Sequence, residues 1–244
     1  GYHPVAGLGK LFAVDSTNIW RPRSHDDVSH LVMDEFDGKK GCVRTQDYTG
    51  VAKCALTIAG AGNEGFFDSA PTGVACPDGT LFLLNTQDGN LSRVHTLPEH
   101  RQRFSAGCVP VPGPAPMFEK FLLETFHNAA DPDECDAQIA LLQEIMGCTL
   151  FALLAKSHVA VVFKGASRAG KGVLTSIISK LVPSEWCVAS DPMNWDNEGQ
   201  RAVLAGARLN LVGELPQSNP VPAHQIKKIL GGDPVDARFP YGQP

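Results

Sequence analysis

The sequence contains no pair of cysteines spaced as CxxC, although it has seven cysteines, at positions 42, 54, 76, 108, 135, 148 and 187. An odd number without that spacing fits neither a disulfide framework nor a zinc knuckle. We therefore expect reduced thiols in a cytoplasm-like compartment. The eight histidines show no HxxxH or HxH spacing, so no metal cluster is indicated. No serine lies in a GxSxG elbow, which leaves a hydrolase triad without support.

Long apolar runs and an excess of positive charge are also lacking. The longest apolar stretch, residues 139–155, is interrupted by Gln143, Glu144 and Thr149 and is too short to span a bilayer. We expect a buried helix there and no membrane partner. The N-terminus shows no basic region before an apolar segment, so we expect no secretory signal. A net charge of −5 gives no global attraction to nucleic acid, and any such contact needs a local basic patch.

The 244 residues, of which 43% are hydrophobic, suffice for one large domain or two small ones. Before residue 110 the pattern is mixed. Residues 25–36 space Val28, Leu31 and Val32 as one helix face after a possible cap at Ser24. Residues 66–95 alternate short apolar runs with the turn signals PDG and QDGN, which predicts hairpins. Residues 109–116 contain four prolines and indicate a stiff connector.

After this connector the pattern becomes helical and then α/β. We expect helices over 117–126 and 131–155, the second beginning with aspartates that cap it. A buried strand over 158–164, a helix over 172–181, a strand over 208–215 and a helix over 224–230 follow. This order is typical of a parallel P-loop core. The predicted fold is α/β: a mixed α+β region at 1–110, a helical connector at 111–156 and a partial P-loop ATPase core at 157–244.

A phosphate-binding loop is predicted between the strand and the helix, because residues 165–172 match GxxxxGK[ST] except at the last position. Glycines let backbone N–H groups close around phosphate oxygens, the following helix directs its positive end at them, and the lysine bridges the phosphates. A structural turn is the alternative interpretation. The predicted nucleotide-binding residues are Gly165, Ala166, Ser167, Arg168, Ala169, Gly170, Lys171, Gly172 and Val173.

Gly172 stands where a serine or threonine hydroxyl usually binds Mg²⁺. Magnesium keeps several waters in most sites, so we expect metal binding that is weakened but not lost. Glu214 is the candidate carboxylate, because it ends the predicted strand at 208–215, 43 residues after Lys171. There it would hold the metal and orient the attacking water. A surface glutamate before a turn is the alternative.

Several stretches resemble the C-terminal portion of phage and plasmid primase–helicases. This family is related to the poxvirus-type primase-helicase and is placed among the superfamily III helicases of the AAA+ group. The stretches are residues 73–84 with 95–104, 138–150, 161–182, and 204–217 with 226–244. A glycine after the loop lysine also occurs in some members of the family, which favours a working variant.

The resemblance implies a ring, usually a hexamer, that hydrolyses ATP between subunits and moves along DNA while a mobile element replicates. It implies ATP and Mg²⁺ as cofactors, single-stranded or forked DNA and a primase or polymerase as partners, and the host cytoplasm as location. Lys171 and its loop would bind phosphate, and Glu214 would serve magnesium and water. Family members continue beyond Gly-Gln-Pro to a sensor asparagine and an arginine. Asn219 lies too close to Glu214 to be that asparagine, so we expect a fragment that hydrolyses ATP slowly.

Two basic segments are candidates for nucleic-acid contact. Lys227, Lys228 and Arg238 follow the acidic strand, as does Asp233. They are either a solvated helix end and its continuation or, by the resemblance, DNA or inter-subunit contacts. Arg101 and Arg103 flank Gln102 beside Phe104, a combination that can hold a nucleic-acid backbone and stack a base, although a solvated loop has the same composition. A small-molecule kinase built on the same loop is another hypothesis, but it would need an arginine-rich lid, and residues 183–203 show none. A nucleotide-independent assembly module of the same replication protein remains an alternative.

Overall fold

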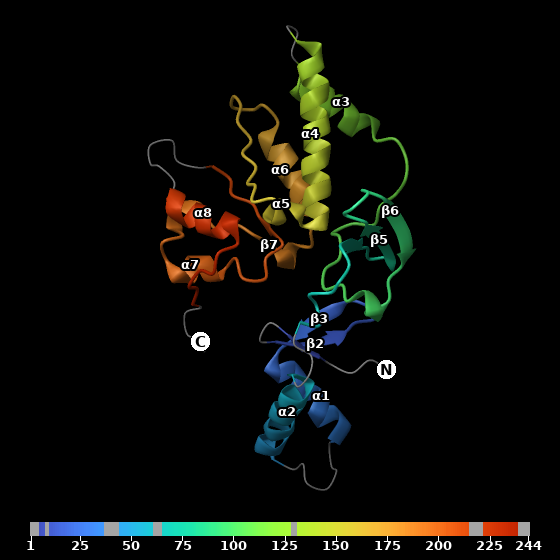
Figure 1. Cartoon of the computed structure of the whole chain (residues 1–244), viewed down its shortest axis with the longest axis vertical. Helices are drawn as coiled ribbons and strands as arrows, with labels where there is room; N and C mark the ends of the chain where they lie inside the picture. The colour runs from blue at the N-terminus through green and yellow to red at the C-terminus, as the bar shows by residue number, and fades with distance from the viewer. Residues whose placement is uncertain are drawn as a thin grey trace. The chain divides into compact units, whose positions relative to one another are not determined.

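The computed structural model describes residues 5–7, 10–36, 44–60, 65–127, 131–214 and 222–238. It divides the chain into two compact units, Gly1–Ser105 and Ala106–Pro244. The fold is mixed α/β, with two small antiparallel sheets in the first unit and a parallel pair of strands in the second (Figure 1). The expected division into segments 1–110, 111–156 and 157–244 stays a prediction.

The first unit combines two three-stranded antiparallel sheets with a pair of helices. Its elements are β1 (Val5–Gly7), β2 (Lys10–Val14), β3 (Trp20–Arg23), α1 (His25–Phe36), α2 (Thr45–Gly60), β4 (Gly73–Ala75), β5 (Thr80–Leu84), β6 (Leu91–His95) and η1 (Pro98–His100). In Figure 1, α1 and α2 lie side by side, and Leu11, Val28 and Ala52 pack together in a buried cluster.

The predicted elements of the first unit are confirmed. The helix over 25–36 is α1, and the Ser24 hydroxyl accepts a hydrogen bond from the Asp27 N–H while the Asp27 carboxylate accepts one from the Ser24 N–H. These reciprocal bonds satisfy donors that the first turn leaves unpaired. The hairpins over 66–95 are β4, β5 and β6, and Gly79 supplies the left-handed conformation that the PDG turn needs.

The second unit is built mainly from helices. Its elements are α3 (Pro116–Thr125), α4 (Pro132–Phe151), α5 (Leu153–Lys156), α6 (Lys171–Lys180), η2 (Ser184–Trp186), β7 (Cys187–Val188), η3 (Pro192–Asn194), α7 (Glu198–Ala202), β8 (Leu209–Asn210) and α8 (Ala223–Gly231). The helices expected over 117–126, 172–181 and 224–230 are confirmed as α3, α6 and α8.

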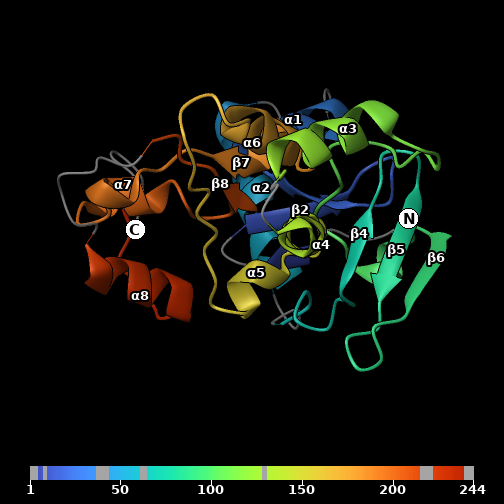
Figure 2. The same ribbon diagram turned by 90° about the horizontal axis from the view of Figure 1, so that it is seen from above.

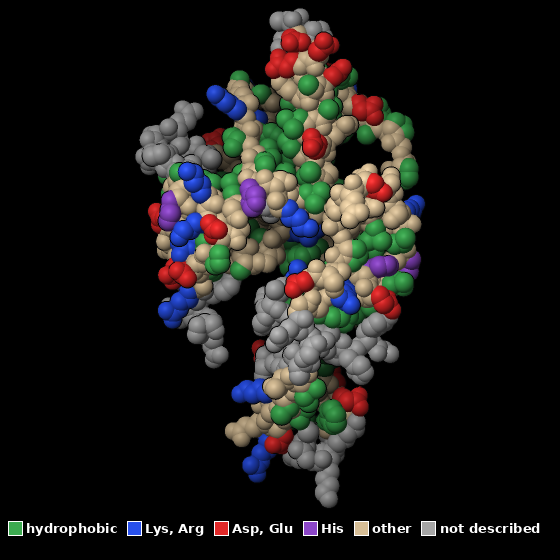
Figure 3. Space-filling view, viewed as in Figure 1, with side chains coloured by type: hydrophobic (Ala, Val, Ile, Leu, Met, Phe, Trp, Pro, Cys, Tyr) green, Lys and Arg blue, Asp and Glu red, His purple; other side chains and the backbone are tan. Residues whose placement is uncertain are grey.

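The helix expected over 131–155 begins as predicted but is interrupted. The Asp131 carboxylate caps α4 by accepting from the Glu134 N–H, and Figure 3 shows acidic side chains gathered at this end of the helix. A negative cap suits the positive end of the helix dipole. Ala152 adopts a left-handed conformation, with φ 54°, and separates α4 from α5. The sequence pattern did not indicate this break, because alanine favours the helix interior.

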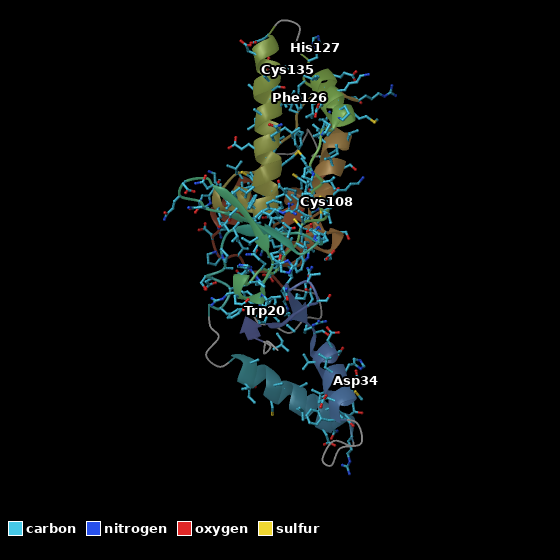
Figure 4. All side chains as sticks on the ribbon, turned by 90° about the vertical axis from the view of Figure 1, so that its right-hand side faces the viewer. Trp20, Asp34, Cys108, Phe126, His127 and Cys135 are labelled. Atoms are coloured by element: carbon cyan, nitrogen blue, oxygen red, sulfur yellow. The ribbon has the colours of Figure 1, made fainter. Side chains whose placement is uncertain are left out.

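The core of the second unit lies where α3, α4 and α6 meet. Leu122, Leu142, Leu174 and Ile178 form its buried cluster, with Leu174 and Ile178 each only 3% exposed. Phe126 packs against this cluster from the end of α3, opposite the start of α4 that Cys135 marks in Figure 4. Leu209 of β8 also packs here, and Figure 2 shows β7 and β8 beside α6.

The prediction of a buried strand over 158–164 is wrong. The described chain forms no strand there, and Val159 and Val162 are 48% and 76% exposed. Only Phe163 of this segment packs against the core cluster. An apolar β-branched run becomes a buried strand only where a neighbouring strand pairs with its backbone. Here β7 and β8 pair with each other, so the parallel P-loop core is not confirmed.

The strand expected over 208–215 is shorter than predicted but has a parallel partner. The β8 strand pairs with β7 in the register Cys187 to Leu209 and Val188 to Asn210. The Asn210 side-chain amide extends this pairing, because it accepts from the Ser190 N–H and donates to the Ser190 carbonyl. Beyond β8, the Leu211 N–H donates to the Val188 carbonyl, and the chain then leads to Glu214.

Two further observations concern membranes and thiols. Within the described ranges, every helix is too short or too polar to cross a bilayer. Among the described residues, Cys54, Cys76, Cys108, Cys135, Cys148 and Cys187 are not joined in disulfides.

We predict that Gly107→Ala lowers the free energy of unfolding by about 1–3 kcal/mol, because overpacking of this size costs that much. A Cβ at Gly107 would lie 2.3 Å from the Lys180 carbonyl oxygen, at the end of α6. Urea unfolding measures the change.

Gly147→Ala is the matched control, because a Cβ there meets no atom within 4 Å and Gly147 lies inside α4. That variant should raise the free energy of unfolding by up to about 1 kcal/mol. Equal stability of the two variants would contradict the close approach at Gly107.

Candidate phosphate-binding site

The loop before α6 has the backbone conformation that a phosphate loop needs at its last glycine. Gly170 is the N-cap of α6 and is left-handed, with φ 78°. A Cβ there would also lie 3.2 Å from ring carbons of Phe121 and from the Thr125 hydroxyl. Glycine is therefore required both by the backbone and by the close approach of α3.

The helix that follows presents its free N–H groups at the loop. The first turn of an α-helix has N–H groups without intrahelical acceptors, and they carry the positive end of the helix dipole. Because Leu174 and Ile178 are buried against α3 and α4, the start of α6 is held in place. The arrangement suits an anion near Lys171 and Gly172.

The Lys171 ammonium turns back onto its own loop. Its Nζ donates to the carbonyl oxygens of Gly165 at 2.8 Å and Ala166 at 2.6 Å. These bonds hold the loop closed, and they keep the positive charge over the space that the loop surrounds. A phosphate oxygen entering this space would replace neutral carbonyl acceptors by a charged acceptor, which forms stronger hydrogen bonds.

The structure brings Glu214 to the same place. A recess of about 200 Å³ is lined by Ser167, Arg168, Ala169, Gly170, Lys171, Gly172 and Glu214. Glu214 is exposed, and no described residue forms an ion pair with it. It follows β8, so the carboxylate stands beyond the carboxyl end of a parallel strand, where ligands of α/β sheets usually bind.

The recess fits the phosphate part of a nucleotide. Pockets for whole ligands usually hold about 300–1,000 Å³, which is more than the 200 Å³ found here. A phosphate chain would occupy this volume, with the ribose and base outside it. A larger recess of about 470 Å³ lies at the other end of α6, lined by Gly107, Ser179, Lys180, Val182, Pro183, Ser184 and Cys187. None of these described lining residues carries a carboxylate, so we place the candidate site at the loop.

Ligands for a metal ion are few at this site. A Cβ at Gly172 would meet no atom within 4 Å, so packing does not exclude a larger residue there. The Thr175 hydroxyl is bound to the carbonyls of Lys171 and Gly172. Across the described ranges, no group of three or more His, Cys, Asp or Glu side chains could hold a metal. Magnesium would rest on Glu214, Ser167, phosphate oxygens and water.

The basic residues after the acidic strand lie elsewhere in the second unit. Lys227 and Lys228 are exposed on α8, and Arg238 is exposed beyond it. None of the three lines the recess formed by the described loop residues. Figure 3 shows cationic and acidic side chains intermixed over α7 and α8, not a uniformly basic surface. Asn219 lies outside the described residues.

Arg101 and Arg103 belong to an aromatic cluster of the first unit. The guanidinium carbons lie 4.6 Å from the Phe66 ring centre for Arg101 and 5.0 Å from that of Phe67 for Arg103. Arg101 also donates to the Phe66 carbonyl and to the Ser69 hydroxyl. Burial lowers the pKa of Arg103, and the nearby Asp68 carboxylate opposes that shift. These contacts give both arginines a role in packing, while nucleic-acid contact stays a prediction.

The sequence interpretation missed the residues that support the loop from other elements. Phe121 and Thr125 of α3 contact Gly170, and Asn210 joins its strand to Ser190. These residues carry no motif, because their role is spatial and depends on how distant segments pack. Amphipathic spacing in α3 was the only available signal.

A scan of the chain against protein-family models and a search of curated proteins both find no match.

We predict that Arg101→Ala lowers the free energy of unfolding by about 1 kcal/mol, because it removes a cation–π contact and hydrogen bonds. Urea unfolding, followed by tryptophan fluorescence, measures the change, since Trp20 packs edge-to-face on Phe66.

Arg44→Ala is the matched control, because Arg44 is exposed and its described hydrogen bond comes from the backbone N–H. Unchanged stability of Arg101→Ala, together with weaker binding to single-stranded DNA, would favour the nucleic-acid interpretation instead.

Proposed function

We propose that the chain is the ATP-binding portion of a DNA helicase, or of a primase-associated ATPase, which serves replication of a phage, plasmid or other mobile element. The observation that carries the proposal is the recess in which the GASRAGKG loop meets Glu214. A nucleotide-hydrolysing site needs a phosphate cradle and a carboxylate beside it, and these groups are 43 residues apart in the sequence.

The roles of the residues follow from their places on the recess. The loop N–H groups and Lys171 would bind the phosphates, and Glu214 would hold Mg²⁺ and orient the attacking water. When bound, Mg²⁺ would neutralise charge on the phosphate oxygens. The parallel pairing of β7 with β8 supports a partial P-loop, AAA+-like core, although the strand before the loop is not formed.

The wider setting is proposed from the resemblance to primase–helicases. We propose that the intact protein forms a ring, usually a hexamer in this family, and that single-stranded or forked DNA is its substrate. A primase or polymerase would be its partner in the host cytoplasm.

One observation favours the second candidate, a nucleotide-independent assembly module. Val159 and Val162 are exposed in an irregular segment that pairs with no described strand. Apolar exposed backbone of this kind is suited to pairing with another chain. In that case the loop would be a structural turn, and oligomerisation would not respond to nucleotide.

We predict that Lys171→Ala abolishes binding of a fluorescent ATP analogue that the unaltered chain binds with a micromolar Kd. The variant removes the ammonium that faces the recess. Fluorescence titration with and without Mg²⁺ measures both affinities.

Lys164→Ala is the matched control, because Lys164 is exposed just before the loop and does not line the recess. It should bind the analogue as the unaltered chain does. If the unaltered chain and Lys171→Ala bind equally, or neither binds, the nucleotide site is refuted and the assembly module becomes the leading function.

We predict that the chain binds single-stranded DNA and that the double variant Lys227→Ala/Lys228→Ala weakens this binding. Each lost phosphate contact should also reduce the slope of log K against log salt by about 1. Fluorescence anisotropy over a range of salt concentrations measures the slope.

Lys120→Ala is the control on α3, where the ammonium is already paired with Glu124 at 3.7 Å. An unchanged salt slope in the double variant would show that α8 is a solvated helix end. No binding even at low salt would remove DNA as the partner.

A further inference from the structure

Arg168 places a second cation in the phosphate loop. It lines the recess together with Lys171 and Glu214, and it is exposed. Lys171 donates to two loop carbonyls, whereas no described residue accepts a hydrogen bond from the Arg168 guanidinium or forms an ion pair with it. The recess therefore has one cation held by the loop and one whose donors remain available.

The backbone conformation at Arg168 is energetically unfavourable for any residue that has a Cβ. Its φ is 64°, in the left-handed region, which costs a residue with a Cβ about 1 kcal/mol or more. Glycine would avoid that cost, and the GxxxxGK pattern leaves the position open. Local backbone preference does not account for an arginine at position 168.

The loop also lacks the hydroxyl that usually fixes the metal, and packing does not impose this lack. A Cβ at Gly172 would meet open space, so a serine would fit. The nearby Thr175 hydroxyl is already bound to helix carbonyls. The recess thus combines one metal ligand fewer with one positive charge more than the loop motif requires.

These features have complementary consequences for a phosphate chain. A bound metal ordinarily neutralises charge on the phosphate oxygens. A guanidinium offers paired N–H donors that match phosphate geometry, and its charge persists at any physiological pH. Arg168 and Lys171 together outweigh the single carboxylate of Glu214 on the recess wall.

We propose that Arg168 binds the phosphate chain of a nucleoside triphosphate and supplies charge neutralisation that a hydroxyl-held metal would otherwise provide. Binding of the nucleotide then depends little on divalent cations. This inference rests on the proposed function, because it assumes that the recess is a nucleotide site. It assigns a phosphate-binding and charge-neutralising role to a loop residue whose identity the motif leaves free.

The test compares the affinity for a fluorescent ATP analogue in EDTA and in Mg²⁺, using the full chain. The unaltered chain should show less than about threefold difference between the two conditions, because a directly bound guanidinium replaces the metal. Arg168→Gln should weaken binding about tenfold in EDTA, the effect of losing one charged hydrogen-bonded contact, and much less in Mg²⁺. Arg168→Lys should lie between them.

Two further variants complete the design. Arg168→Gly suits the left-handed backbone and should fold at least as well as the unaltered chain, so its loss of binding in EDTA would not reflect misfolding. Gly172→Ser adds the absent hydroxyl in open space and should increase the effect of Mg²⁺ on affinity. Circular dichroism and thermal unfolding monitor the fold of each variant.

The outcomes separate this inference from the proposed function. If Arg168→Gln and Arg168→Gly lose the same factor with and without Mg²⁺, or lose nothing, charge replacement by Arg168 is wrong while the nucleotide site stands. A tenfold or larger gain of the unaltered chain in Mg²⁺ would also overturn it. If the unaltered chain binds in neither condition, the proposed function fails and this inference fails with it.

Discussion

The packing of one face of α6 against α3 and α4 is the constraint on which the candidate site depends. Leu174 and Ile178 are almost fully buried in the cluster that also contains Leu122 and Leu142. Because a helix is rigid, fixing this face also fixes where its first turn points. The loop is then shaped by a second contact, in which a Cβ at Gly170 would lie 3.2 Å from Phe121 and Thr125 of α3, closer than an ordinary van der Waals contact. The geometry of the candidate phosphate site is therefore a consequence of apolar packing one and two turns away from it.

The cationic side chains of this molecule differ in whether other residues of the chain already bind them. Arg101 and Arg103 stack on phenylalanine rings in the first unit, and Arg201, only 8% exposed, donates to the carbonyls of Trp195 and Asp236. Guanidinium groups with such partners contribute to packing and order the chain around them. Arg168, by contrast, lies on the wall of a recess without a described partner. Formal net charge, which is −5, does not distinguish these two kinds of cation.

The segment before the loop, residues 158–164, bears on both proposed functions of the chain, nucleotide binding and assembly. In a P-loop core this segment would be a paired strand, which would anchor the loop from the other side. Here only Phe163 reaches the core, while Val159 and Val162 remain exposed. The loop is consequently held mainly from its helical side. The segment before it pairs with no described strand, and the Val159 N–H donates to the Leu154 carbonyl. Nucleotide binding and assembly through this segment would use neighbouring parts of the same unit.

Local patterns in the sequence predicted α1, α3, α6, α8 and the start of α4, together with the hairpins, the Ser24 cap and the glycine loop, because each depends on residues close together in the chain. They also identified both halves of the candidate site, Lys171 with its loop and Glu214. They did not predict α2, α7 or the break between α4 and α5. Only the tertiary structure decided that these halves share one recess, that Gly170 is pressed by α3, and that Arg168 faces the recess unpaired. It also decided against the strand over 158–164, since a strand requires a pairing partner that periodicity cannot supply. The periodicity of buried residues can be recognised in the sequence itself. Strand pairing, close approach of backbones and the pairing of charged side chains depend on contacts between segments that are distant in the chain.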